Sequence, residues 1–290
     1  MLDYGVLYFA YGSNLDSENW ALWCEKRGYD ATSIEALGPA WLPDHDLVFH
    51  YQSRLRKGGA LDLRPRRGGA IPGALFRVHD WAGLDAKEGV PGGYYRRISV
   101  TTLTDDGQAH PAITYRVCDA RIGEFVAPSP EYRQIVIRGL SRFGHGSDLF
   151  LAAARGAPAP PTPSAIFTYG TLMRGEPGHH LLASKVRHAH GAAQVAGASL
   201  VRLGWYPGLV LGGGNGPVHG ELYELDELAA ALEALDSYED FAGYDREGSL
   251  YRRSLVSALS SSGSMLAWTY IYLGDADAYP LIPSGRWSSA

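Results

Sequence analysis

Two glutamates stand in the same local frame, one in each half of the 290-residue sequence. Glu88 follows Asp85 in the segment LDAKE, and Glu239 follows Asp236 in LDSYE. Each frame is typical of a helix end, and a glycine-containing connection comes next. Apolar neighbours such as Val90 would raise the pKa of the carboxyl group by desolvation, which suits it to proton transfer. The frames therefore predict acid/base chemistry, the alternative being an ordinary solvated glutamate.

A glycine-containing turn follows a short predicted strand in each half. Because glycine has no side chain, successive backbone N–H groups can point into one concavity that binds a carboxylate or a phosphate. The alternative is an ordinary turn between a strand and a helix, but recurrence in both halves favours a binding role. The residues are Tyr11, Gly12, Ser13, Asn14 and Leu15 in the first half, and Tyr169, Gly170, Thr171 and Leu172 in the second.

Other kinds of chemistry have little support in the sequence. The pairs Arg96-Arg97 and Arg252-Arg253 would bind a carboxylate or form ion pairs with nearby acidic residues. The two cysteines and 10 histidines show no spacing typical of metal ligands. The sequence contains no Walker loop, dinucleotide fingerprint or Gly-x-Ser-x-Gly elbow. We therefore expect neither a metal nor a cofactor.

The elements that carry these residues occur twice, in the same order. The offsets between matching segments are 158, 147, 156 and 155 residues. Four matches in one order indicate a duplicated domain. The pairs are YFAYGSNL (8–15) with IFTYGTLM (166–173), GALFRV (73–78) with GELYEL (220–225), YRRISV (95–100) with YRRSLV (251–256), and AITYRV (112–117) with AWTYIY (267–272).

Each half is predicted to be α+β, with a small mixed barrel and flanking helices. Strands outnumber helices, and the clearest helical stretches are Trp81–Lys87 and Asp226–Tyr238. A proline-led segment, 128–144, adds a helix to the first half only. The Pro/Ala-rich segment from Ala154 to Ser164 reads as a linker. We accordingly expect domains at 1–153 and 165–290.

Composition is that of a soluble globular protein, with 46% hydrophobic and 20% charged residues. No apolar run reaches the ~20 residues of a membrane helix. The start Met1-Leu2-Asp3 lacks the features of a signal peptide, so we expect a cytoplasmic protein without membrane partners. Net charge is −5, and the basic cluster between Arg54 and Arg67 is expected to be a solvated hairpin rather than a nucleic-acid site.

At these residues the chain resembles the γ-glutamyl cyclotransferase-like superfamily. The first half is similar to the γ-glutamyl cyclotransferase branch and the second to the AIG2-like, γ-glutamylamine cyclotransferase branch. The resemblance covers nearly the whole chain outside the linker. Its segments are FAYGSNL (9–15), LDAKEGVPGGYYRRISV (84–100) and PSPEY (128–132), then FTYGTLMRG (167–175), YPG (206–208), GELYEL (220–225) and LDSYE (235–239).

The resemblance implies a small barrel and a lyase that cleaves γ-glutamyl amides into 5-oxoproline and a free amine. It assigns the acid/base role to Glu88 and Glu239 and substrate binding to the two glycine turns. Supporting aromatic residues are implied at Tyr95, Tyr132 and Tyr251. Spacing makes the last assignment ambiguous, because 11 residues separate Glu239 from Tyr251, against six between Glu88 and Tyr95. Tyr244 is the competing residue.

The implied partner is a small γ-glutamyl compound, whose identity the sequence leaves open. The alternatives are a module that binds γ-glutamyl ligands without catalysis, or another amide-bond lyase or acyltransferase acting on a γ-glutamyl-tagged metabolite. A tandem chain could also pair its own two domains.

Overall fold

The computed structural model describes residues 6–159, 162–212 and 216–288. It divides into two compact units, Met1–Thr102 with His110–Pro160, and Leu103–Ala109 with Pro161–Ala290. The N-terminal Met1-Leu2-Asp3 and residues 160–161 of the predicted linker lie outside the described residues. The domain boundaries expected from the sequence stay a prediction.

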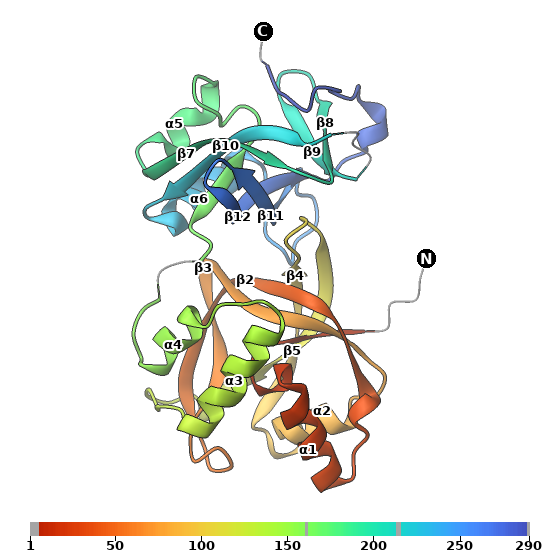
Figure 1. Cartoon of the computed structure of the whole chain (residues 1–290), viewed down its shortest axis with the longest axis vertical. Coiled ribbons are helices and arrows are strands. Elements are labelled where there is room, and N and C mark those ends of the chain that lie inside the picture. Colours follow the sequence, from red (N-terminus) through yellow and green to blue (C-terminus); the bar gives the residue numbers. More distant parts are fainter. Residues whose placement is uncertain (1–5, 160–161, 213–215, 289–290) are drawn as a thin grey trace. The chain divides into compact units, whose positions relative to one another are not determined.

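The first unit is built around a closed five-stranded barrel with the strand order β1-β3-β2-β4-β5 (Figure 1). The barrel closes where β1 pairs in parallel with β5, through Tyr8 and Ile113. Its core includes the fully buried Phe9, Leu63 and Tyr115. The elements are β1 (Leu7–Ala10), β2 (Ile34–Ser53), β3 (Gly58–Val78), β4 (Tyr95–Leu103) and β5 (Ala109–Val117), with α1 (Ser17–Arg27), α2 (Ala82–Glu88), α3 (Pro130–Arg142) and α4 (Asp148–Ala154).

The second unit has a closed barrel of the order β10-β6-β12-β11-β7 and a separate two-stranded sheet, β8-β9. Among its described residues, no α-helix follows β12, so the difference predicted between the two halves is confirmed. The elements are β6 (Ala165–Thr168), β7 (Val186–Val195), β8 (Ala198–Arg202), β9 (Pro207–Leu211), β10 (Val218–Leu225), β11 (Tyr251–Ser260) and β12 (Gly263–Tyr272), with α5 (His180–Ala183) and α6 (Leu228–Tyr238).

The strand registers match between the two barrels. Tyr8 lies opposite Phe76 and Ile113, whereas Ile166 lies opposite Tyr223 and Trp268. These positions differ by 158, 147 and 155 residues, the offsets found in the sequence. The predicted α+β fold with two tandem barrels is confirmed.

Equivalent glycines keep the first strand of each barrel close to its neighbour. A Cβ on Gly73 would lie 2.2 Å from the carbonyl oxygen of Ala10, and one on Gly220 would lie 2.0 Å from that of Thr168. A larger residue at either position would push the strand away together with the turn that follows it. Both glycines therefore help to fix the position of a glycine turn.

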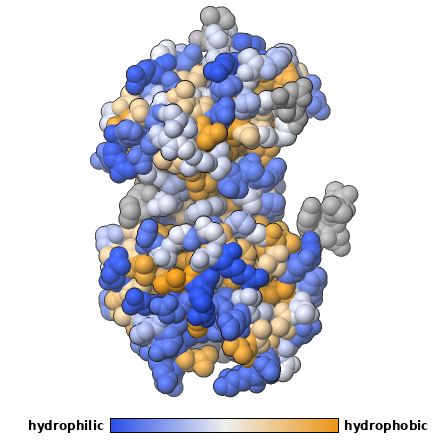
Figure 2. Space-filling view, in the orientation of Figure 1, coloured by the Kyte–Doolittle hydropathy of each residue, from blue (hydrophilic) through white to orange (hydrophobic). Residues whose placement is uncertain are grey.

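Helices α2, α3 and α6 are present where they were predicted, and their ends lie within two residues of the predicted bounds. Helices α1, α4 and α5 were not predicted. Figure 2 shows hydrophilic residues over much of the viewed surface of both units, with hydrophobic residues in groups among them. Within the described part of the chain, none of the helices combines the length and apolar character that a membrane crossing requires.

Candidate active site

The two glutamates sit at equivalent helix ends. Glu88 is the last residue of α2, which Gly89 terminates in the left-handed conformation at φ 66°. Glu239 comes directly after α6, in the C-cap position. Both side chains are half-buried. The end of each helix therefore places its glutamate in the wall of a pocket.

The aspartate three residues before each glutamate anchors that helix to the barrel. In the first unit, Tyr115 donates to Asp85 Oδ1 at 2.8 Å, and Arg97 donates to the same carboxylate at 2.6 and 2.8 Å. The second unit repeats this arrangement, with Tyr270 donating to Asp236 at 2.8 Å and Arg253 at 2.5 Å. Arg97 and Arg253 thus form ion pairs, one of the two alternatives expected from the sequence, and Arg96 also lies 3.9 Å from Asp119 Oδ2.

The glycine turns are also held in the same way. Tyr11 donates its hydroxyl hydrogen to the carbonyl of Tyr115 at 2.7 Å, and Tyr169 does so to the carbonyl of Tyr270 at 2.7 Å. A single helical turn, Ser13–Leu15, follows in the first unit. The first N–H groups of such a turn have no partner inside it, so they are free to meet a ligand.

In the first unit, Asn14 connects the glycine turn to the glutamate. Its Nδ2 atom donates to Glu88 Oε1 at 2.8 Å and to the Tyr8 hydroxyl at 2.9 Å. Tyr95 donates to the carbonyl of Leu61 at 2.8 Å, which fixes the ring beside the glutamate. An inner cavity of about 30 Å³ is enclosed by these residues together with Tyr11, Gly12, Ser13, Tyr115 and Tyr132.

An outer pocket of about 710 Å³ shares Ser13, Glu88, Tyr95 and Tyr132 with the inner cavity. Its cationic side chains are Arg54, Arg56, Lys87 and Arg121.

The prediction of a solvated hairpin is wrong for Arg56. This side chain is half-buried, donates to Ser13 Oγ at 2.8 Å and lies over the ring of Tyr132, 4.9 Å from its centre. The β2–β3 hairpin brings it there across 43 residues of sequence. No local pattern in the sequence could have revealed this contact.

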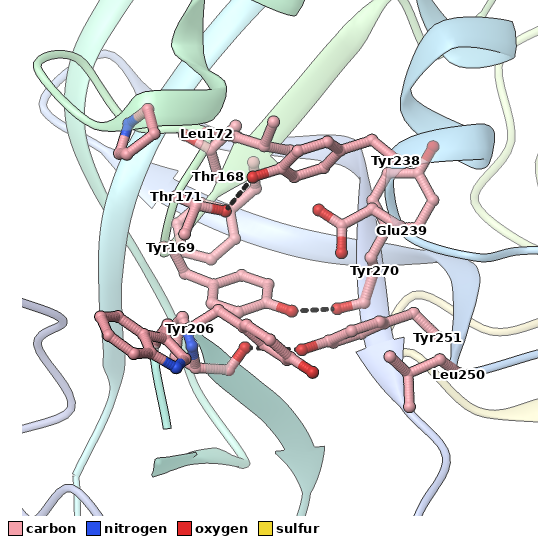
Figure 3. A pocket seen from close by; sticks show the side chains of 15 residues that line it. Thr168, Tyr169, Thr171, Leu172, Tyr206, Tyr238, Glu239, Leu250, Tyr251 and Tyr270 are labelled. Atoms are coloured by element: carbon pink, nitrogen blue, oxygen red, sulfur yellow. Dashed lines mark hydrogen bonds between the residues drawn. The ribbon is translucent and has the colours of Figure 1, made fainter. Parts of the chain in front are cut away.

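The second pocket has a volume of about 420 Å³ and contains Glu239 (Figure 3). Tyr251 donates to the carbonyl of Pro207 at 2.8 Å, as Tyr95 does to Leu61. Tyr238 donates to Thr171 Oγ1 at 3.2 Å, and this contact is drawn in Figure 3. Further lining residues are Tyr169, Gly170, Leu172, Trp205, Tyr206 and Tyr270.

Tyr251, and not Tyr244, occupies the position equivalent to Tyr95. Tyr251 begins β11, as Tyr95 begins β4, and it lines the pocket. Tyr244 instead donates to the carbonyl of Arg253 at 2.9 Å and packs on Phe241. Tyr251 is therefore the counterpart of Tyr95. Trp205 was not predicted to line the pocket, because an isolated aromatic residue gives no periodic signal. Tyr206 and Tyr238 lie in the segments YPG and LDSYE, but no binding role was assigned to them.

The two glutamates differ in their electrostatic surroundings. Burial raises the pKa of Glu88, while Lys87, the Asn14 hydrogen bond and Arg56 oppose that increase. Burial raises the pKa of Glu239 to about 8. Leu172 stands where the first unit has Asn14 and offers no hydrogen-bond donor. At neutral pH the second glutamate is therefore mostly protonated, as a carboxylic acid.

The described residues contain no group of three or more His, Cys, Asp or Glu side chains arranged to hold a metal ion.

Comparison with known proteins places this geometry in a family. The family model for "Gamma-glutamyl cyclotransferase, AIG2-like" matches residues 8–134 and again 166–289. The chain belongs to this family and carries its domain twice.

Three relatives illustrate the similarity. The "Gamma-glutamylcyclotransferase family protein YtfP" of Escherichia coli K12 is 34% identical over 122 residues, 42% of this chain and 94% of the relative. The "Gamma-L-glutamyl-butirosin B gamma-glutamyl cyclotransferase" of Niallia circulans is 34% identical over 110 residues, 38% of this chain and 67% of the relative. The "Gamma-glutamylcyclotransferase" of Bos taurus is 31% identical over 144 residues, 48% and 71% of the two chains.

Proposed function

We propose that the chain is a γ-glutamyl cyclotransferase with two active sites, which convert γ-glutamyl amides into 5-oxoproline and a free amine. The observation that carries this proposal is the repeated placement of a half-buried glutamate with a raised pKa in a pocket beside a glycine turn. Membership of the family supports it. The proposed partner is a small molecule, and the cytoplasmic location stays a prediction.

The reaction is intramolecular, so the site has little to do beyond folding the glutamyl arm and moving protons. Glu88, as the carboxylate, takes a proton from the substrate's α-ammonium group. The α-nitrogen then attacks the γ-carbonyl carbon and closes a five-membered ring. As the C–N bond to the leaving amine breaks, Glu88 returns the proton to that nitrogen, and the regenerated carboxylate accepts the second proton that the ring nitrogen must lose to become the neutral lactam. This second proton passes to the freed amine, which leaves as an ammonium ion, and Glu88 is again a carboxylate.

The glycine turns would bind the substrate's α-carboxylate or the oxyanion that forms on the γ-carbonyl. In the first site this role falls to the turn from Tyr11 to Leu15, with Tyr95 and Tyr132 forming the walls. In the second site it falls to the turn from Tyr169 to Leu172, with Tyr251 as the wall and Glu239 as the acid/base. The Niallia circulans relative is named for γ-L-glutamyl-butirosin B, which supports including γ-glutamyl compounds of different kinds among the substrates tested.

The test is release of 5-oxoproline from a panel of γ-glutamyl dipeptides and γ-glutamyl amines. The proteins are wild type, Glu88→Gln, Glu239→Gln and the double variant. Positioned acid–base catalysis contributes roughly 10²–10⁴-fold, so the double variant should lose activity by that factor. Glu18→Gln and Glu233→Gln are matched controls, since both glutamates are exposed on helices.

Full turnover by the double variant would overturn the assignment of the glutamates. A wild-type protein that binds the panel without forming 5-oxoproline would instead support a non-catalytic binding module.

A further inference from the structure

The mouth of the second pocket is aromatic and open to solvent. Trp205 is 91% exposed, although it lines the same pocket as the half-buried Glu239. Tyr206 and Tyr238 are 38% and 45% exposed. A short turn between β8 and β9 carries Trp205 and Tyr206, and Leu203 closes it by donating to the Tyr206 carbonyl at 3.0 Å. A large exposed aromatic surface beside a pocket is typical of a place that a ligand covers.

The two pockets differ in charge. Among the described residues that line the second pocket, Glu239 is the one ionisable side chain other than tyrosines. It is mostly uncharged below pH 8. The outer pocket of the first site has four cationic side chains, named above, and Glu88 as its carboxyl group. A charged group on the leaving amine would thus find counter-charges in the first pocket and none among the described residues that line the second.

The position of the reacting atoms fixes which part of the substrate meets the aromatic mouth. The glutamyl arm must reach both the turn that includes Thr171 and the carboxyl group of Glu239. Figure 3 shows these two groups facing the same space, with Tyr206 on another wall. In this arrangement the substrate beyond the scissile amide would extend toward Trp205, Tyr206 and Leu250, which line the same pocket.

We propose that the second site is specific for γ-glutamyl amides whose leaving amine carries an uncharged aromatic group. This inference rests on the proposed function and names the substrate class of one of its two sites. An aromatic ring would stack on the rings of Trp205 and Tyr206 and remove them from water. A carboxylate or a second ammonium group on the leaving amine would lose hydration there without gaining an opposite charge.

The test uses the Glu88→Gln protein, in which the second site alone keeps its glutamate. Three substrates are compared: γ-glutamylbenzylamide, γ-glutamylglycine and the γ-glutamyl amide of 1,4-diaminobutane. We expect kcat/KM for the benzylamide to exceed the other two by about tenfold or more, since stacking and charge desolvation act in the same direction. The Glu239→Gln protein serves as the contrast and should not show this preference.

A second variant tests the aromatic mouth directly. Trp205→Ala in the Glu88→Gln protein should raise KM for the benzylamide by about tenfold and leave kcat nearly unchanged, because the contact binds ground state and transition state alike. Because Trp205 is highly exposed, its removal takes little packing from the folded protein, and a thermal unfolding curve checks that the variant is folded. Leu259→Ala, at an exposed residue of β11, is the control.

Equal turnover of the three substrates, a preference for the diamine, or no effect of Trp205→Ala would overturn the inference. Release of 5-oxoproline from γ-glutamylglycine by the Glu239→Gln protein establishes the proposed function separately. If neither site turns over any substrate, the affinity for the benzylamide, measured by titration calorimetry, still tests the inference. The Glu88→Gln/Glu239→Gln protein should bind this compound, and adding Trp205→Ala should weaken the binding about tenfold.

Discussion

At the scale of single residues, the two glutamates differ in the groups that surround them. Asn14 donates to Glu88, and Lys87 and Arg56 add positive charge near it, so several groups favour its carboxylate form. Leu172 replaces the asparagine beside Glu239, and burial alone raises the pKa of that group to about 8. The surroundings thus favour the carboxylate form of Glu88 and the neutral, protonated form of Glu239.

This difference predicts a pH-dependent effect of Glu239→Gln on stability. A folded-state pKa of about 8, above the ordinary value of 4.5, means that ionisation opposes folding. Wild-type stability should therefore fall as pH rises from about 4.5 to 8, whereas glutamine cannot ionise. We expect the variant to melt a few degrees above wild type at pH 9 and close to it at pH 5.

Differential scanning calorimetry at pH 5, 7 and 9 measures this effect. Glu233→Gln, at an exposed residue of the same helix, should show no such trend. A melting difference for Glu239→Gln that is the same at all three pH values would contradict the raised pKa.

At the scale of the elements, the ion pair that anchors the helix to the barrel is more buried in the second unit than in the first. Arg253 has no exposed side-chain surface and Asp236 has 9%, while the corresponding values for Arg97 and Asp85 are 36% and 26%. An ion pair out of contact with water depends on both partners, because neither can be resolvated when the other is lost. The two helix anchors, although alike in geometry, should therefore differ in energetic importance.

We predict that Asp236→Asn destabilises its unit by about 3–5 kcal/mol, because it leaves the Arg253 charge buried without its carboxylate. Asp85→Asn should cost about 1 kcal/mol or less in the first unit, where water screens the pair. Native-state hydrogen exchange measures both, since amides of β11 and β12 report on one barrel and amides of β4 and β5 on the other. Equal losses of protection would show that burial does not set the strength of these anchors.

At the scale of the whole molecule, two sites of different acidity belong to one chain. Each pocket is lined by residues of its own unit. We predict that kcat/KM of the Glu88→Gln protein, which reports on the second site, rises with pH through about 8 as Glu239 ionises. The Glu239→Gln protein should reach its plateau at a lower pH.

Rates measured from pH 5 to 10 on one substrate for each variant test this prediction. The substrate's own α-ammonium group titrates too, so both variants are compared on the same substrate. A common midpoint in the two profiles would contradict the difference in acidity that the pockets indicate.

The sequence predicted the barrels well, because apolar and aromatic side chains fill equivalent positions in both and so leave a repeat in the sequence. It also paired the glycine turns with the glutamates. Other features depend on contacts between distant segments. Arg56 reaches its site through a hairpin, and Trp205 through a turn that carries no pattern. Helix α1 was missed because its two buried residues, Trp20 and Cys24, are too few to form a readable apolar stripe.

Barrel closure has a consequence for how the chain reaches its native state. Every described barrel strand has neighbours on both sides, so the finished barrels offer no edge to a strand from elsewhere. Before closure, however, two similar repeats on one chain can trade equivalent strands, as tandem repeats are prone to do. A hybrid that took β6 in place of β1 would carry Ile166 where Tyr8 belongs and Leu172 where Asn14 belongs. The sequence differences between the two copies, which give the two sites different chemistry, thus also disfavour exchange of strands between the barrels.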